Sequence, residues 1–149
     1  MIRSTHTYFL ASVLFLFGFI TQNTFAESNV STVQIEVILV KASNGSDGID
    51  PALRSYSNTL ERLFRFKSYQ QISRDSFKVD VPGKATAKLG QGNRLTIDAQ
   101  STRNGIAADL DWSAGIHARL NLKKGTPAVL GGPKIKDGDG TYLLIIRLK

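Results

Sequence analysis

Apolar and polar residues alternate along most of the chain from residue 33 onward. A period of two is typical of β-strands that bury one face and expose the other. The alternation predicts strands within the segments 33–40, 77–81, 85–89, 95–99, 106–112, 116–122, 127–130 and 141–148. Turn residues separate these runs at short intervals, so we expect a mainly β fold, an antiparallel β-sandwich-like single domain. In the first run, Ile38 and Val40 make both faces apolar, which indicates a central strand.

One segment has helical spacing instead. Asp50 can accept hydrogen bonds from the first free amides of a helix, and Pro51 suits its first turn. The apolar positions that follow form one stripe: Leu53, Tyr56, Leu60, Leu63 and Phe64. The spacing predicts one amphipathic helix over 51–65, after the first strand, with this stripe packed on a sheet.

The segment 106–122 contains the sharpest candidate for chemistry. A three-residue turn at 113–115 would place Asp111 opposite His117 and Asp109 opposite Arg119. A carboxylate beside an imidazole is the orienting half of a nucleophilic triad, and such groups can also bind a metal. Opposite charges are equally the ordinary content of a solvated sheet face. We interpret these residues as surface ion pairs, with Asp109, Asp111 and His117 as the catalytic alternative.

Two glycine-rich motifs lie between apolar runs, at Gly90-Gln91-Gly92 and at Leu130-Gly131-Gly132-Pro133. A phosphate-binding loop joins a strand to a helix and closes with Lys-Ser/Thr. Neither motif has that context, so we expect both to connect strands.

Composition removes several classes of function. The 149 residues contain no cysteine and two histidines. Disulfide scaffolds, zinc ribbons, iron–sulfur clusters and thiol nucleophiles are therefore excluded. With so few candidate ligands, we predict no metal and no other cofactor.

The N-terminus resembles an export signal. Arg3 precedes an apolar run over 8–20, and small residues precede a cleavage point after Ala26. A helical run of that length reaches about 20 Å, short of the ~30 Å needed to cross a bilayer. We expect residues 1–26 to be a cleaved signal peptide and 27–149 to be a β-rich globular domain without a transmembrane helix. A domain exported without disulfides suits the bacterial periplasm or exterior.

Cleavage would remove one of the 19 bases and none of the 12 acids, leaving a net charge of +6. The candidate binding bases form two groups in the sequence: Arg54, Arg62, Arg65 and Lys67, and Lys123, Lys124, Lys134 and Lys136. Such an excess attracts anionic polymers or lipid headgroups. Export argues against nucleic acid as the natural partner.

Three segments resemble the β-domain of bacterial outer-membrane secretins: the opening strand 33–40, the strand–turn–strand segment 118–132 with its Gly-Gly ending, and the apolar closing strand 141–146. Secretins also have preceding periplasmic domains and membrane-spanning hairpins, which this pattern lacks. The resemblance therefore implies a small exported relative of the secretin β-domain. The chain is also similar to uncharacterised small periplasmic proteins with an Ile-Asp-Pro helix start and a Gly-Gly-Pro before the last strand.

These observations favour an exported, non-enzymatic binding or accessory module, serving an envelope or secretion assembly. Two alternatives remain open: a secreted hydrolase using Asp109, Asp111 and His117, and a binder of anionic surface polymer or lipid headgroups through the basic groups. The last strand would also allow partnering by strand addition if it formed an exposed edge. The oligomeric state is left open.

Overall fold

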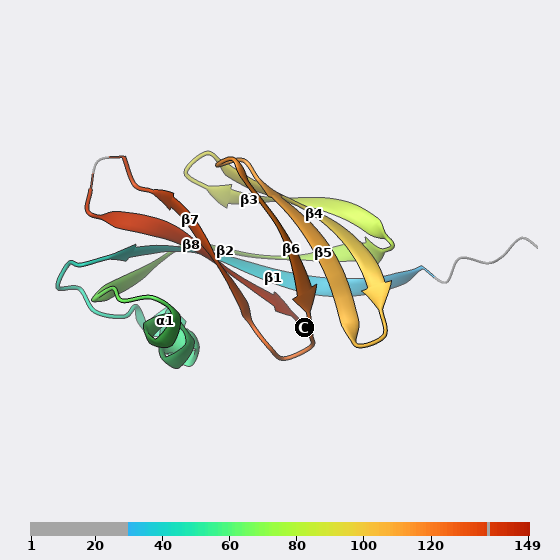
Figure 1. Cartoon of the computed structure of the whole chain (residues 1–149), viewed down its shortest axis with the longest axis horizontal. Helices are drawn as coiled ribbons and strands as arrows, with labels where there is room; N and C mark the ends of the chain where they lie inside the picture. The colour runs from blue at the N-terminus through green and yellow to red at the C-terminus, as the bar shows by residue number, and fades with distance from the viewer. Residues whose placement is uncertain (1–29, 137) are drawn as a thin grey trace, which may run out of the picture.

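The alternating segments pair into two four-stranded antiparallel sheets that pack face to face (Figure 1). The computed structural model describes residues 30–136 and 138–149. The predicted signal peptide, residues 1–26, lies outside these residues. Sheet A has the order β2 (Ser68–Val81), β1 (Ser31–Ser43), β8 (Gly140–Leu148), β7 (Ala128–Lys134). Sheet B has the order β3 (Gly83–Gly90), β4 (Asn93–Thr102), β5 (Gly105–Trp112), β6 (Ile116–Leu122). The predicted mainly β, sandwich-like architecture is confirmed.

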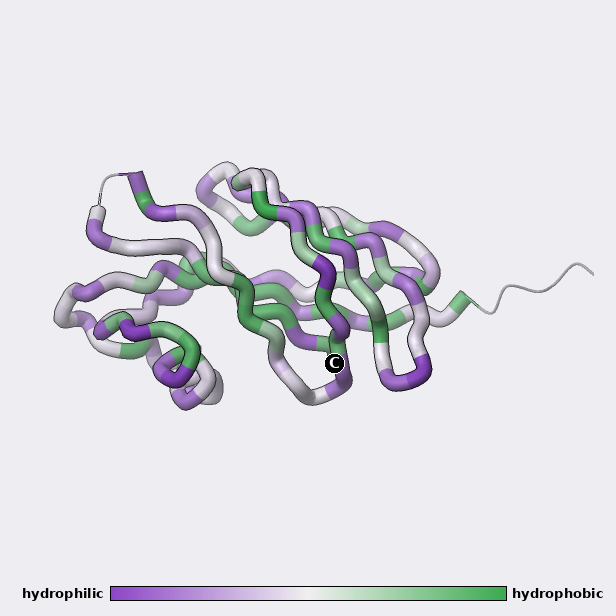
Figure 2. Tube along the Cα trace, viewed as in Figure 1, coloured by the Kyte–Doolittle hydropathy of each residue, from purple (hydrophilic) through white to green (hydrophobic). Residues whose placement is uncertain are grey.

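The core between the sheets consists of the apolar positions that alternate along the strands. Sheet A contributes Ile35, Val37, Leu39, Leu144 and Ile146; sheet B contributes Leu95, Ile97, Leu110 and Trp112. Burying one such side chain stabilises the fold by about 1.5–3 kcal/mol. Figure 2 shows hydrophobic stretches through the middle of the molecule and hydrophilic residues at turns. Period-two patterning therefore determines which face of each strand becomes the core.

β1 is a central strand, as its double apolar pattern predicts. Its partners are β2 on one side and β8 on the other. The closing strand β8 is also central, because β7 pairs with its free side. The prediction that the last strand could be an exposed edge is therefore wrong, and the edge strands of sheet A are β7 and β2.

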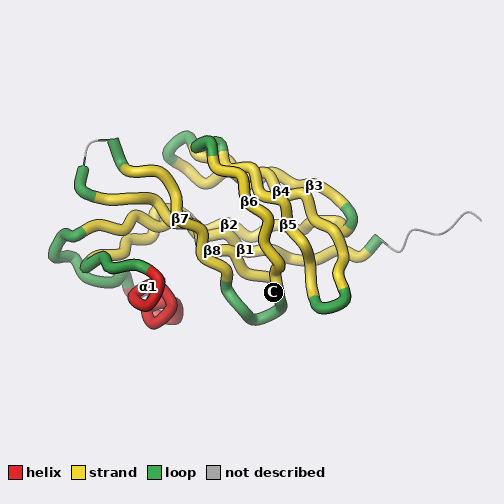
Figure 3. The backbone as a smooth tube through the Cα atoms, viewed as in Figure 1, coloured by secondary structure: helices red, strands yellow, loops and turns green. Residues whose placement is uncertain are grey.

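The helical segment covers the outer face of sheet A at one end of the molecule (Figure 3). It is a 3₁₀ helix η1 (Pro51–Tyr56) followed by an α-helix α1 (Ser57–Leu63), and the side chain of Asp50 accepts from the Ala52 amide at 2.9 Å. Leu53, Tyr56 and Leu60 are buried against sheet A. The predicted packing of an amphipathic helix on a sheet is confirmed.

The predicted end of the helix is wrong by two residues. Phe64 already has extended backbone angles, so Leu63 is the last helical residue. Leu63 is 52% exposed rather than part of the packed stripe. The chain has to leave the helix here because it must turn back to begin β2 at Ser68.

Gly131 and Gly132 lie inside β7 instead of connecting strands, which corrects the prediction. A Cβ atom at Gly132 would be 2.2 Å from Cη2 of Trp112 and 2.6 Å from the carbonyl oxygen of Tyr142. Only glycine allows the edge strand to approach the buried tryptophan this closely. Gly90-Gln91-Gly92, by contrast, joins β3 to β4 as expected.

Candidate functional site

The outer face of sheet B carries two rows of polar side chains that run across its four strands. Strand register places Lys84, Asp98, Asp109 and Arg119 in one row. Thr86, Thr96, Asp111 and His117 form the next row. Polar positions on neighbouring strands line up in this way because each strand presents alternate residues to the same face.

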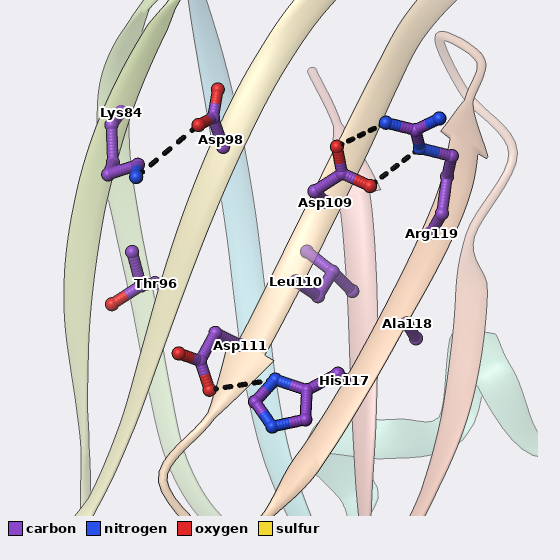
Figure 4. A pocket seen from close by; sticks show the side chains of 9 residues that line it. All are labelled: Lys84, Thr96, Asp98, Asp109, Leu110, Asp111, His117, Ala118 and Arg119. Carbon is purple, nitrogen blue, oxygen red and sulfur yellow. Dashed lines mark hydrogen bonds and ion pairs between the residues drawn. The ribbon is translucent and has the colours of Figure 1, made fainter.

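Asp109 and Arg119 make the tightest contact on this face. The Nε and Nη2 atoms of Arg119 donate to the two carboxylate oxygens of Asp109, both at 2.6 Å (Figure 4). The Arg119 hydrogen bonds hold the pKa of the Asp109 carboxyl below its ordinary value. Asp109 therefore stays ionised, and both of its carboxylate oxygens accept hydrogen bonds from Arg119.

Asp111 and His117 face each other as the hairpin register predicts. His117 Nδ1 lies 3.3 Å from Asp111 Oδ1, and the two side chains are 74% and 63% exposed. On the neighbouring strands, Lys84 Nζ lies 3.4 Å from Asp98 Oδ2. Each of the three acids on this face thus has a cross-strand basic partner (Figure 4).

The face is hollowed only shallowly. A depression of about 470 Å³ is lined by both rows, with Leu110 and Ala118 between them. Within the described residues, no three His, Asp or Glu side chains come close enough together to hold a metal ion. The arrangement presents paired polar and charged side chains to solvent, which is suited to recognising a polar surface.

In the structure, the eight predicted binding bases do not form the two groups that their positions in the sequence suggest. All eight residues are exposed. Lys123 and Lys124 precede β7 and Lys134 ends it, so a seven-residue strand of roughly 20 Å separates them. Lys134 instead lines a groove with Phe64 and Phe66, beside the helix-side bases.

A buried carboxylate that sequence reasoning missed organises a further set of bases. Glu36 is 3% exposed, on the outer face of sheet A. Its Oε1 lies 3.0 Å from Lys149 Nζ and 3.5 Å from Arg74 Nη1. Its Oε2 lies 3.1 Å from Arg147 Nη2 and accepts from the Tyr56 hydroxyl at 3.2 Å. We call Glu36, Tyr56, Arg74, Arg147 and Lys149 the Glu36 cluster.

The Glu36 cluster keeps its central carboxylate ionised. Burial raises the pKa of Glu36, but the Lys149 hydrogen bond and the charges of Arg147, Lys149 and Arg74 outweigh burial and lower it overall. Burial, and then the Glu36 charge, raise the pKa of Tyr56, which stays a donor. The sequence signal for the cluster is Glu36 itself, an acid between Ile35 and Val37 in a strand whose second half is apolar on both faces.

Among the residues described, no helix is long and apolar enough to cross a membrane. The chain matches no protein-family model, no curated protein and no solved structure. The resemblance to secretin β-domain strands and to small periplasmic proteins stays a prediction.

Proposed function

We propose that the chain is an exported, non-enzymatic binding or accessory module of the bacterial envelope. One observation carries the proposal: the acids of the sheet-B face, the candidate catalytic ones included, are paired with basic partners on an open surface. A general base needs a carboxylate or imidazole free to take a proton from a bound substrate. Asp109 instead holds Arg119 with both oxygens.

A sandwich of this kind supports recognition because its surfaces are preformed. Both sheets are antiparallel and joined by a continuous buried core, so side chains on the outer faces keep their spacing. Fixed spacing reduces the ordering entropy that binding would otherwise cost. Export is supported by the leader-like pattern of residues 1–26.

Photo-crosslinking in the native envelope tests the proposal. A photoreactive residue is placed at Thr96, in the centre of the sheet-B face, and at Asn58 on the exposed side of α1 as the matched control. We expect one discrete protein adduct from Thr96 that persists at high salt and is missing from Asn58. Adducts that are absent from both positions, or identical at both, would contradict a partner-binding face on sheet B.

The hydrolase alternative depends on Asp109, Asp111 and His117. It requires an activity of the exported protein that the His117→Ala variant loses. We expect any activity that co-purifies with the protein to be unchanged by this substitution, because His117 is exposed beside a single acid.

A second candidate function, binding to an anionic lipid surface, is favoured by Leu63. This leucine is 52% exposed and follows Arg62, while Arg65 and Lys67 are exposed close behind it. An apolar side chain among bases can insert at the boundary between headgroups and acyl chains. Lys134 adds a further base across the groove formed with Phe64 and Phe66.

Vesicle flotation tests this candidate. The protein should float with vesicles of equal parts phosphatidylcholine and phosphatidylglycerol but not with phosphatidylcholine alone. Leu63→Ser and Arg65→Glu should each weaken flotation, and Lys88→Glu on sheet B is the control. Equal flotation of all variants would overturn a lipid role for the segment 62–67.

A further inference from the structure

A small hollow lies beside the Glu36 cluster, where β8 ends. It measures about 240 Å³ and is lined by Lys124, Gly125, Arg147, Leu148 and Lys149. Main-chain contacts hold the loop of Lys124 against the strand end. The Gly125 amide donates to the Leu148 carbonyl at 3.3 Å, and Lys124 forms a β-bridge with Leu148.

The cations of the hollow keep hydrogen-bond donors to spare. Arg147 has five N–H groups, and its contact with Glu36 uses Nη2. Its buried Nε has no partner among the described residues. Lys149 has three N–H groups on Nζ, one of which meets Glu36 at 3.0 Å. Both side chains are about one-third exposed and line the hollow, so part of each is open to solvent there.

The local charge is net positive. Arg74, Arg147 and Lys149 surround the Glu36 carboxylate, and Lys124 adds a fourth cation to the lining of the hollow, against the Glu36 charge and the main-chain carboxylate of Lys149. Glu36 carries a single negative charge shared among three cations, so it cannot neutralise all of them. Its effect is to hold Arg147 and Lys149 side by side against their mutual repulsion, which prepares both for an external anion.

We propose that the hollow defined by Lys124, Arg147 and Lys149 is a binding site for a phosphate-type oxyanion. A guanidinium presents paired N–H donors that match phosphate oxygens, and flanking ammonium groups supply further charge. The hollow is open to solvent, so a phosphate group can reach its lining cations directly. This inference rests on the proposed function, because it names the ligand class of one surface of the binding module.

NMR titration of the folded domain with inorganic phosphate tests the site, with chloride at matched ionic strength as the reference. We expect saturable shifts at the amides of Gly125, Leu148 and Lys149. Lys124→Met should weaken the apparent affinity about tenfold, as expected for losing one charge-assisted contact. Lys124 makes no contact with Glu36 in the cluster, so folding is expected to be intact. Lys88→Met is the matched control.

Arg147→Lys is the second variant, because it keeps the positive charge beside Glu36 and loses the guanidinium fork. It should bind phosphate more weakly than the unmodified protein while its unfolding curve stays close to normal. Shifts that track ionic strength alone, or that are equal in Lys124→Met and Lys88→Met, would overturn the proposal.

Two further arms identify the source of the phosphate. Soluble glycerol phosphate and phosphatidylglycerol vesicles are compared: competition by glycerol phosphate alone indicates a small solute, and Lys124-dependent binding to vesicles indicates a lipid headgroup. The envelope crosslink from Thr96 separates this inference from the proposed function. An intact Thr96 adduct without saturable phosphate binding would reject the phosphate site and leave the binding module standing.

Discussion

Glu36 in sheet A and Asp109 in sheet B each hold an arginine on a neighbouring strand, but in opposite environments. Glu36 is 3% exposed and receives three cations and a tyrosine hydroxyl. Asp109 has a side chain that is 44% exposed and receives Arg119 alone in the register of the hairpin. The exposed pair has the shorter distances: the nitrogen atoms of Arg119 lie 2.6 Å from the oxygens of Asp109, whereas the cations around Glu36 lie 3.0–3.5 Å from its oxygens.

Contact distance alone therefore does not rank the contributions of these ion pairs to stability. An ion pair in water is screened and gains little, whereas a buried carboxylate depends on its partners because it has lost its hydration. We therefore expect the longer contacts of Glu36 to influence stability more than the shorter contacts of Asp109. The same reasoning makes the Glu36 cluster a rigid organiser of cations and the sheet-B face an ordinary, paired polar surface.

Glu36→Gln should have the largest effect. It keeps the shape of the side chain but leaves Arg74, Arg147 and Lys149 without their counter-charge. We expect the free energy of unfolding to fall by about 2–4 kcal/mol, at the lower end for breaking a buried pair, because the cations are partly exposed. Urea unfolding followed by the fluorescence of Trp112, the single tryptophan, measures this change. A loss of stability as small as that of Asp109→Asn would show that burial does not strengthen the contacts of Glu36.

Acid should destabilise the protein through Glu36 in particular. The folded-state pKa of Glu36 is lowered, so the unfolded chain takes up the proton first as the pH falls. Its contribution is complete well above the ordinary glutamate pKa of about 4.3 and is lost as the pH falls through the folded value. Denaturant midpoints measured between neutral and acid pH should fall less steeply for Glu36→Gln. Parallel curves for both proteins would contradict this.

Tyr56→Phe should have an intermediate effect. The substitution removes the hydroxyl that donates to Glu36 Oε2 at 3.2 Å and leaves the buried ring in place. We expect a loss of about 1 kcal/mol, typical of one hydrogen bond. Tyr142→Phe is the matched control, since Tyr142 packs against the core between the sheets. If Tyr56→Phe lowered the free energy of unfolding no more than Tyr142→Phe does, the Tyr56 hydroxyl would not contribute to the stability of the Glu36 cluster.

Asp109→Asn and His117→Ala should have the smallest effects on stability. Both change exposed side chains whose partners remain hydrated. The difference between Asp109→Asn and the unmodified protein should shrink further when salt is added, because screening weakens exposed pairs. Thermal unfolding at low and high salt checks this, and a large salt-independent loss would show that the face is more than surface pairing.

Sequence patterning predicted the hairpin 106–122 down to its register. A short turn of fixed length sets which residues oppose each other, so local information was sufficient to pair Asp111 with His117 and Asp109 with Arg119. The helix was predicted for the same reason, since Asp50 and Pro51 mark its start within a few residues.

Long-range relations were not accessible in the same way. The Glu36 cluster joins residues 36, 74 and 147, which are brought together only when β2 and β8 pair with β1. The sequence around Gly132 predicts a connection between strands. The reason for a glycine at this position is the close contact with Trp112, which lies in the other sheet and is distant in the sequence. Local propensity describes elements well, but contacts between distant strands decide which glycines and charges matter.

Two double-mutant cycles test the central claim most directly. One cycle combines Glu36→Gln with Arg147→Met, and the other combines Asp109→Asn with Arg119→Met, with unfolding free energies measured under the same conditions. We expect a coupling energy of about 1–3 kcal/mol for Glu36 and Arg147, which share a buried network. The coupling between Asp109 and Arg119 should be clearly smaller. Equal couplings, or a larger one on sheet B, would show that burial does not make the Glu36 contacts the more important ones.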